Sequence, residues 1–132
     1  MAQHPSAQID RFVHDRLPPP DQWPELRYDL PELQALPEQL NVVQALFDRA
    51  FAAGHADRPL FRSDERTLSY AQARAEVNRF ANVLADMGLQ PGNRVLLRGG
   101  NSVAMALAWL AVVQAGLVVV ATMPLLRAKE LQ

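Results

Sequence analysis

The pattern of hydrophobic and polar residues changes at Asn41, where apolar side chains begin to recur every three or four positions. This spacing predicts a helix with one buried face, which Asn41 caps and Gly54 ends. Its apolar positions are Val43, Leu46, Phe47, Ala50 and Phe51. A second helix is predicted over 70–87, because Ser69 and Gln72 have the spacing of a capping box. Its expected buried face comprises Tyr70, Ala73, Val77, Phe80, Ala81, Leu84 and Met87.

Short apolar runs outside these helices predict strands. Two of them, at 60–62 and 67–68, flank a polar turn and indicate a small hairpin. A third follows the Pro-Gly-Asn turn after Gly88 and predicts a strand over 94–98. Beyond it, the 28 residues between Arg98 and Arg127 carry no formal charge. Stretches of this kind occur both in membrane spans and in the buried cores of α/β domains.

The internal order of the uncharged stretch favours a buried core over a membrane span. It is long enough for a transmembrane helix, which needs about 20 apolar residues, but Gln114 and Gly116 interrupt it. The part before Gln114 is rich in alanine and leucine, whereas the part after Gly116 is β-branched. We therefore expect a helix over 103–114 and a strand over 117–121 that is buried on both faces. With the strand at 94–98 they form a β-α-β unit with parallel strands.

Two glycines precede the helix of this unit and raise the alternative of a phosphate-binding turn. The sequence Gly99-Gly100-Asn101-Ser102 lacks the third glycine of a dinucleotide fingerprint and the lysine of a P-loop. Asn101 or Ser102 suffices to cap the helix. We interpret the glycines as a structural turn, with phosphate binding as the alternative.

Residues 1–40 have a different character and are expected to form a proline-rich, largely extended arm. Six of the ten prolines fall between Pro18 and Pro37, which restricts this segment to short turns. Its apolar residues are expected to anchor it on the protein: Trp23, Leu26, Tyr28, Leu30 and Leu33. The alternative is a ligand for a partner such as an SH3-like domain. The segment 9–17 predicts a short helix with Ile9, Phe12 and Val13 on one side.

Composition excludes several classes of function. The net charge of −1 and the pI near 6.3 argue against a nucleic-acid partner or an acidic membrane surface. The absence of cysteine excludes disulfides and thiolate sites, and His4, His14 and His55 are too scattered to suggest a metal site. No catalytic motif is present in the 132 residues. The first residues do not resemble a secretory signal, so a cytoplasmic location is expected.

From Thr67 onward the chain resembles a known family. The segments VNRFANVL, GLQPGNRV and the Asn-Ser helix start occur in the order and spacing of the N-terminal region of AMP-dependent acyl-CoA synthetases, the adenylate-forming ligases. The segments IDRFVHDRLPPPDQWPEL, YDLPEL and VVVATMPLLRAKEL are most similar to the 2-aminobenzoate (anthranilate) and benzoate type of aryl-CoA ligase. The resemblance extends from about Ile9 to Gln132.

The resemblance implies an α/β fold in which residues 41–132 are the first part of the large AMP-binding domain. It implies a reaction in which an aryl carboxylate and Mg-ATP form an acyl-adenylate, from which CoA then displaces AMP to give a thioester. ATP, Mg²⁺ and CoA are the implied cofactors. The family's lysine-ending phosphate loop and its other nucleotide and catalytic motifs are not found in this chain. The chain is therefore expected to be an N-terminal fragment, inactive alone.

One site is carried over from relatives, in which the loop after the second parallel strand contacts the CoA nucleotide. In this chain that loop is Met123, Pro124 and Leu125, where those relatives have an aromatic residue and two glycines. The alternative is that Met123 and Leu125 are packing residues. Two other functions also stay open. One is an adenylation domain that loads an aryl acid onto a carrier protein, and the other is a non-catalytic module that binds a partner through the arm. Self-association is expected, because the β-α-β unit belongs to a larger sheet in the family.

Overall fold

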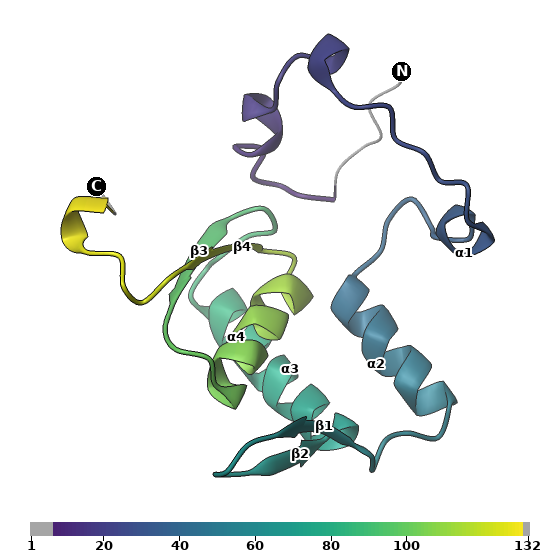
Figure 1. The fold of residues 1–132 in the computed structure, drawn as a ribbon, viewed down its shortest axis with the longest axis vertical. Coiled ribbons are helices and arrows are strands. Elements are labelled where there is room, and N and C mark those ends of the chain that lie inside the picture. Colours follow the sequence, from purple (N-terminus) through teal and green to yellow (C-terminus); the bar gives the residue numbers. More distant parts are fainter. Residues whose placement is uncertain (1–6, 131–132) are drawn as a thin grey trace.

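Three helices pack side by side and form the body of the protein (Figure 1). They are α2 (Val42–Ala52), α3 (Tyr70–Asp86) and α4 (Val103–Gln114). The computed structural model describes residues 7–130. The core lies between the three helices and a small hairpin, and its buried members are Val43, Phe47, Leu68, Ala73, Val77, Leu107 and Ala111.

The helices begin where the sequence predicts. The Asn41 side-chain oxygen accepts hydrogen bonds from the backbone N–H groups of Val43 and Gln44, both at 3.2 Å. Ser69 and Gln72 form both bonds of the capping box, at 2.9 and 3.2 Å. These contacts satisfy N–H groups that have no partner inside the helix. The predicted caps are confirmed.

The predicted strands are also confirmed. Strand β1 (Pro59–Arg62) pairs with β2 (Thr67–Ser69) as an antiparallel hairpin. Strand β3 (Arg94–Arg98) pairs in parallel with β4 (Val118–Thr122), with Arg94 opposite Val118 and Arg98 opposite Thr122. Helix α4 connects β3 to β4 and contacts both strands. The uncharged stretch therefore forms a β-α-β unit, and no helix within residues 7–130 is long and apolar enough to cross a membrane.

Several expectations about burial are wrong. On α2, Leu46 was expected on the buried face but is 44% exposed. Phe80 on α3 and Met87 at its C-cap are exposed, because the buried face of the helix is narrower than expected and comprises Ala73, Val77 and Ala81. The parallel strands are not buried on both faces. Leu96 and Val120 lie opposite each other and are 55% and 39% exposed. Only α4 among the described helices packs extensively on these strands, which leaves Leu96 and Val120 without a helix over them within residues 7–130.

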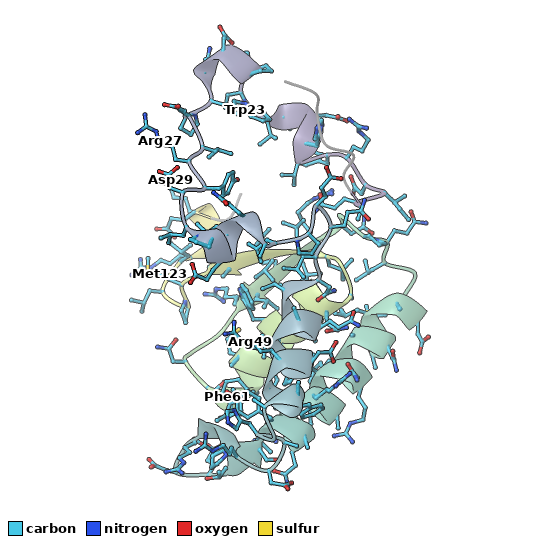
Figure 2. All side chains as sticks on the ribbon, turned by 90° about the vertical axis from the view of Figure 1, so that its right-hand side faces the viewer. Trp23, Arg27, Asp29, Arg49, Phe61 and Met123 are labelled. Carbon is cyan, nitrogen blue, oxygen red and sulfur yellow. The ribbon has the colours of Figure 1, made fainter. Side chains whose placement is uncertain are left out.

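The arm is extended with short turns, as predicted, but it does not pack on the body. Its turns are η1 (His14–Arg16), η2 (Pro20–Gln22) and the four-residue α1 (Pro31–Gln34), so the helix expected over 9–17 is reduced to one turn. The arm arcs away from the helices, with Trp23 near its far end (Figures 1 and 2). The five expected anchors are 39–62% exposed. The Trp23 indole N–H bonds the Pro18 carbonyl at 2.6 Å, so its polar group is satisfied within the arm.

Instead, the arm is attached at its start. The N–H groups of Ile9 and Asp10 both donate to the Pro91 carbonyl at 2.9 Å. The Asp10 carboxylate accepts hydrogen bonds from Asn93 at 2.7 Å and from Arg94. A hydrogen bond from the Phe12 backbone and the Arg94 guanidinium hold the pKa of Asp10 below its usual range. The start of the arm, at Ile9 and Asp10, is thus fixed to the turn before β3.

Candidate functional site

The carboxyl ends of β3 and β4 form one edge, and the two loops of interest both leave from it. Arg98 and Thr122 are the last residues of the two strands and are direct register partners. The Gly99–Ser102 turn follows β3, and the loop that begins at Met123 follows β4. In parallel α/β sheets, ligands bind outside the carboxyl ends of the strands. The structure therefore brings the glycine turn and the predicted coenzyme loop to the same edge.

The predicted coenzyme loop presents its side chains outward. Met123, labelled in Figure 2, is 64% exposed, and Leu125 is 86% exposed. Neither side chain belongs to the core of the described residues. Within the loop, the Leu126 N–H bonds the Met123 carbonyl at 3.2 Å. The contact of Met123, Pro124 and Leu125 with CoA stays a prediction.

The glycine turn has the geometry of a helix start. The Ser102 hydroxyl accepts a hydrogen bond from the Met105 N–H at 3.1 Å and caps α4, as predicted. Neither Gly99 nor Gly100 has a positive φ. A Cβ at Gly99 would lie 2.5 Å from the end of the Met105 side chain, whereas a Cβ at Gly100 would meet nothing within 4 Å. The geometry fits a structural turn and gives no support to the phosphate alternative.

Two residues at this edge were not singled out from the sequence. Arg98 donates from Nη2 to the carbonyls of Pro124 and Leu126, both at 2.7 Å. The Thr122 hydroxyl oxygen is buried and is the one such side-chain atom without a hydrogen-bond partner in residues 7–130. The sequence feature that could have pointed to Arg98 is its position. It is the last charged residue before the apolar stretch and lies at the end of a predicted strand.

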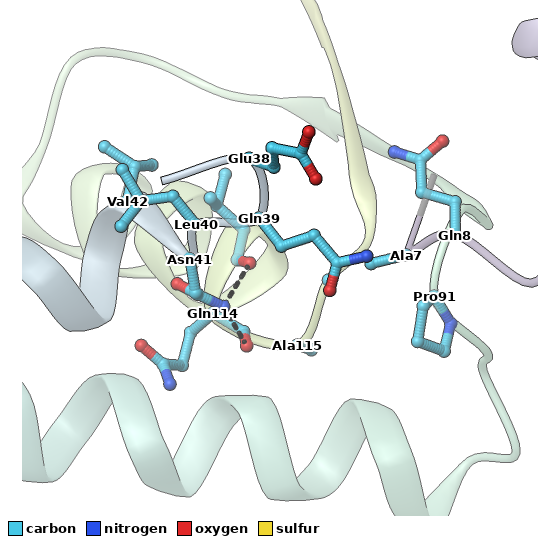
Figure 3. Close-up of a pocket in the computed structure, with 12 residues that line it drawn as sticks. Ala7, Gln8, Glu38, Gln39, Leu40, Asn41, Val42, Pro91, Gln114 and Ala115 are labelled. Carbon is cyan, nitrogen blue, oxygen red and sulfur yellow. Dashed lines mark hydrogen bonds between the residues drawn. The ribbon is translucent and has the colours of Figure 1, made fainter. Parts of the chain in front are cut away.

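A pocket lies between the arm and the body (Figure 3). Its volume is about 590 Å³, and it is lined by Ala7, Gln8, Glu38, Gln39, Leu40, Asn41, Val42, Pro91, Val113, Gln114, Ala115 and Gly116. The Asn41 amide donates to the carbonyls of Gln114, at 2.9 Å, and Val113, at 3.3 Å. Asn41 therefore caps α2 and also binds the last carbonyls of α4. The lining combines small apolar side chains with four side-chain amides, and Glu38 is its one ionisable side chain, so it offers no acid–base pair.

No group of three or more potential metal-ligating side chains occurs within residues 7–130. The described part of the carboxyl edge therefore contains no cluster for a divalent cation. A β-α-β unit with exposed loops at the carboxyl edge is typical of nucleotide-binding α/β proteins.

Comparison with known proteins identifies the family. The model of a family described as AMP-binding enzyme matches residues 48–132, which is more than half of the chain. The chain belongs to this family. The structural comparison agrees with this family assignment, because the fold resembles the N-terminal part of solved adenylate-forming enzymes. The anthranilate CoA ligase AuaEII, solved with anthranoyl-AMP, has a TM-score of 0.68 at 23% identity over 74% of this chain and 19% of that chain.

Two further matches bear on the finer class. A benzoate CoA ligase from Burkholderia xenovorans LB400 has a TM-score of 0.61 at 28% identity, over 67% of this chain and 18% of that chain. The acetyl-coenzyme A synthetase of Mycobacterium bovis is 42% identical over 65 residues, which are 45% of this chain and 10% of the relative. The chain thus matches about a tenth of the length of the curated relatives and less than a fifth of the solved enzymes.

Proposed function

We propose that residues 1–132 are the N-terminal part of an ATP-dependent aryl-CoA ligase of the 2-aminobenzoate or benzoate type. In this proposal, residues 1–40 are the arm and residues 41–132 begin the AMP-binding domain. The observation that carries it is the family match over 48–132. The likeness to a benzoate CoA ligase supports the aryl class. The acetyl-coenzyme A synthetase match supports the broader class of acyl-CoA ligase.

The proposed reaction divides between this chain and the rest of the enzyme. Attack of a carboxylate on the α-phosphate of ATP needs Mg²⁺ and cationic groups to stabilise the charge that develops on the phosphates. The described residues contain neither a metal-ligating cluster nor a lysine-ending glycine loop. They do not fit Mg-ATP, so we assign adenylation to the remainder of the enzyme and expect residues 1–132 alone to be inactive.

The loop after β4 supports a contact with part of CoA. The exposed side chains of Met123 and Leu125 at the carboxyl edge offer an apolar surface of the kind on which an adenine ring can lie. We propose that Met123, Pro124 and Leu125 contact the CoA nucleotide.

The exposed Leu96 and Val120 on the outer face of the parallel strands support self-association of the isolated chain. We place the enzyme in the cytoplasm.

The substrate is tested with the complete polypeptide to which this chain belongs. We expect acid-dependent exchange of pyrophosphate into ATP with benzoate and 2-aminobenzoate, at least tenfold faster than with acetate or medium-chain fatty acids. Addition of CoA should then yield the aryl thioester, detected by mass spectrometry. A preference for acetate would contradict the aryl class. Exchange without any CoA-dependent thioester would indicate transfer to a carrier protein instead.

A further inference from the structure

The loop that follows β4 is held by one side chain from the neighbouring strand. Arg98 is the last residue of β3, and its Nη2 donates to the carbonyls of Pro124 and Leu126 at 2.7 Å each. Both distances are short for N–H···O bonds, as expected when the donor carries a charge. The two acceptors lie on either side of Leu125, so the bonds fix the backbone on both sides of its exposed side chain.

Little else constrains this loop. Within the loop, the Leu126 N–H makes a weaker turn bond to the Met123 carbonyl, at 3.2 Å. Its side chains do not enter the core. Arg98 forms no ion pair in the part of the chain that the structure describes, so its charge is not committed to a carboxylate. The conformation of the loop therefore depends strongly on Arg98.

We propose that Arg98 is a positioning residue for the CoA step, which sets the backbone of residues 123–126 so that Met123 and Leu125 face the coenzyme. This inference rests on the proposed function and specifies one of its sites. Arg98 acts through the loop and makes no contact with the acid or ATP. Its loss should therefore affect the use of CoA and leave adenylation intact, because a binding surface displaced by about 1 Å loses much of its effect.

The test uses R98M and R98K in the complete polypeptide. Methionine keeps most of the side-chain length but removes the donor, so R98M should raise the KM for CoA about tenfold while ATP–pyrophosphate exchange stays within about twofold of the wild type. Lysine keeps a charged donor on a shorter side chain, so R98K should give a KM for CoA between those of the wild type and R98M. Hydrogen exchange of the peptide covering 123–130 should become faster in R98M.

Arg94 provides the matched control, because it is the first residue of the same strand. Its guanidinium contacts Asp10 and the Phe12 ring at the opposite end of β3. R94M should loosen the start of the arm. It should leave unchanged both the KM for CoA and the rate of hydrogen exchange at residues 123–130.

Three results would overturn the proposal for Arg98. The first is an unchanged KM for CoA in R98M, and the second is an unchanged rate of hydrogen exchange at residues 123–130 in the same variant. The third is an equal loss of adenylation and thioester formation, which would indicate a structural role only. If the wild-type polypeptide showed no acid-dependent pyrophosphate exchange, the proposed function itself would fail, and this inference with it.

Discussion

Replacing Gly92 by alanine is expected to lower the free energy of unfolding by about 2–4 kcal/mol and to release residues 8–12 from the body. Gly92 is buried and has a φ of +94°, which an L-residue adopts only with strain. An added Cβ would lie 2.2 Å from the carbonyl oxygen of Asp10. Because that atom belongs to the backbone, the whole segment would have to move. The bonds from Ile9 and Asp10 to Pro91 would then be lost.

Gly88 is the control for this prediction, since it also has a positive φ, of +81°, but a Cβ there would meet nothing within 4 Å. G88A should cost only the conformational strain, about 1 kcal/mol. Urea denaturation gives both values, and hydrogen exchange at residues 8–12 should increase in G92A alone. Equal destabilisation by the two substitutions would contradict the docking of the N-terminal segment against this turn.

Replacing Leu107 by alanine is expected to destabilise the protein by about 3 kcal/mol, a large part of the stability of a small domain. Leu107 is fully buried on α4. Helices α3 and α4 pack against each other with Ala73 and Ala111 in the same core. The small residues permit a close approach, and surrounding helices cannot easily collapse into the space that a missing leucine leaves.

Leu125 is the control for the core, because the same substitution is made at a side chain that is 86% exposed. L125A should change the free energy of unfolding by less than about 0.5 kcal/mol. The midpoint of urea unfolding should thus fall for L107A and stay in place for L125A. A comparable loss in both variants would mean that the loop after β4 packs more tightly than the structure indicates.

Local signals in the sequence predicted the elements well, because their causes are local. Asn41, Ser69 and Ser102 cap helices through bonds to residues two or three positions away. The switch at Gly116 from helix-forming to β-branched residues is likewise contained within a few positions. The β-α-β unit could be predicted for this reason, and with it the edge at which the two loops meet.

Expectations that depended on distant contacts were less accurate. The anchors of the arm were expected to be buried because they are apolar, but Trp23 satisfies its polar group inside the arm and remains 41% exposed. Asp10 was not singled out, since its partners Asn93 and Arg94 lie more than 80 residues away. Arg98 was predicted only as the end of a strand. Its bonds to Pro124 and Leu126 could not be predicted, because they depend on the parallel pairing of β3 with β4. Such partners can be assigned only once the strands are placed together.

Our central proposal is that this member of the AMP-binding enzyme family is part of an acyl-activating enzyme whose nucleotide chemistry is supplied by residues outside 1–132. Pyrophosphate exchange into ATP, measured with 2-aminobenzoate and Mg²⁺ for the complete polypeptide and for residues 1–132 side by side, tests it most directly. We predict acid-dependent exchange by the complete polypeptide and none above background by residues 1–132. Exchange by residues 1–132 alone, or its absence from the complete polypeptide with every acid offered, would contradict the claim.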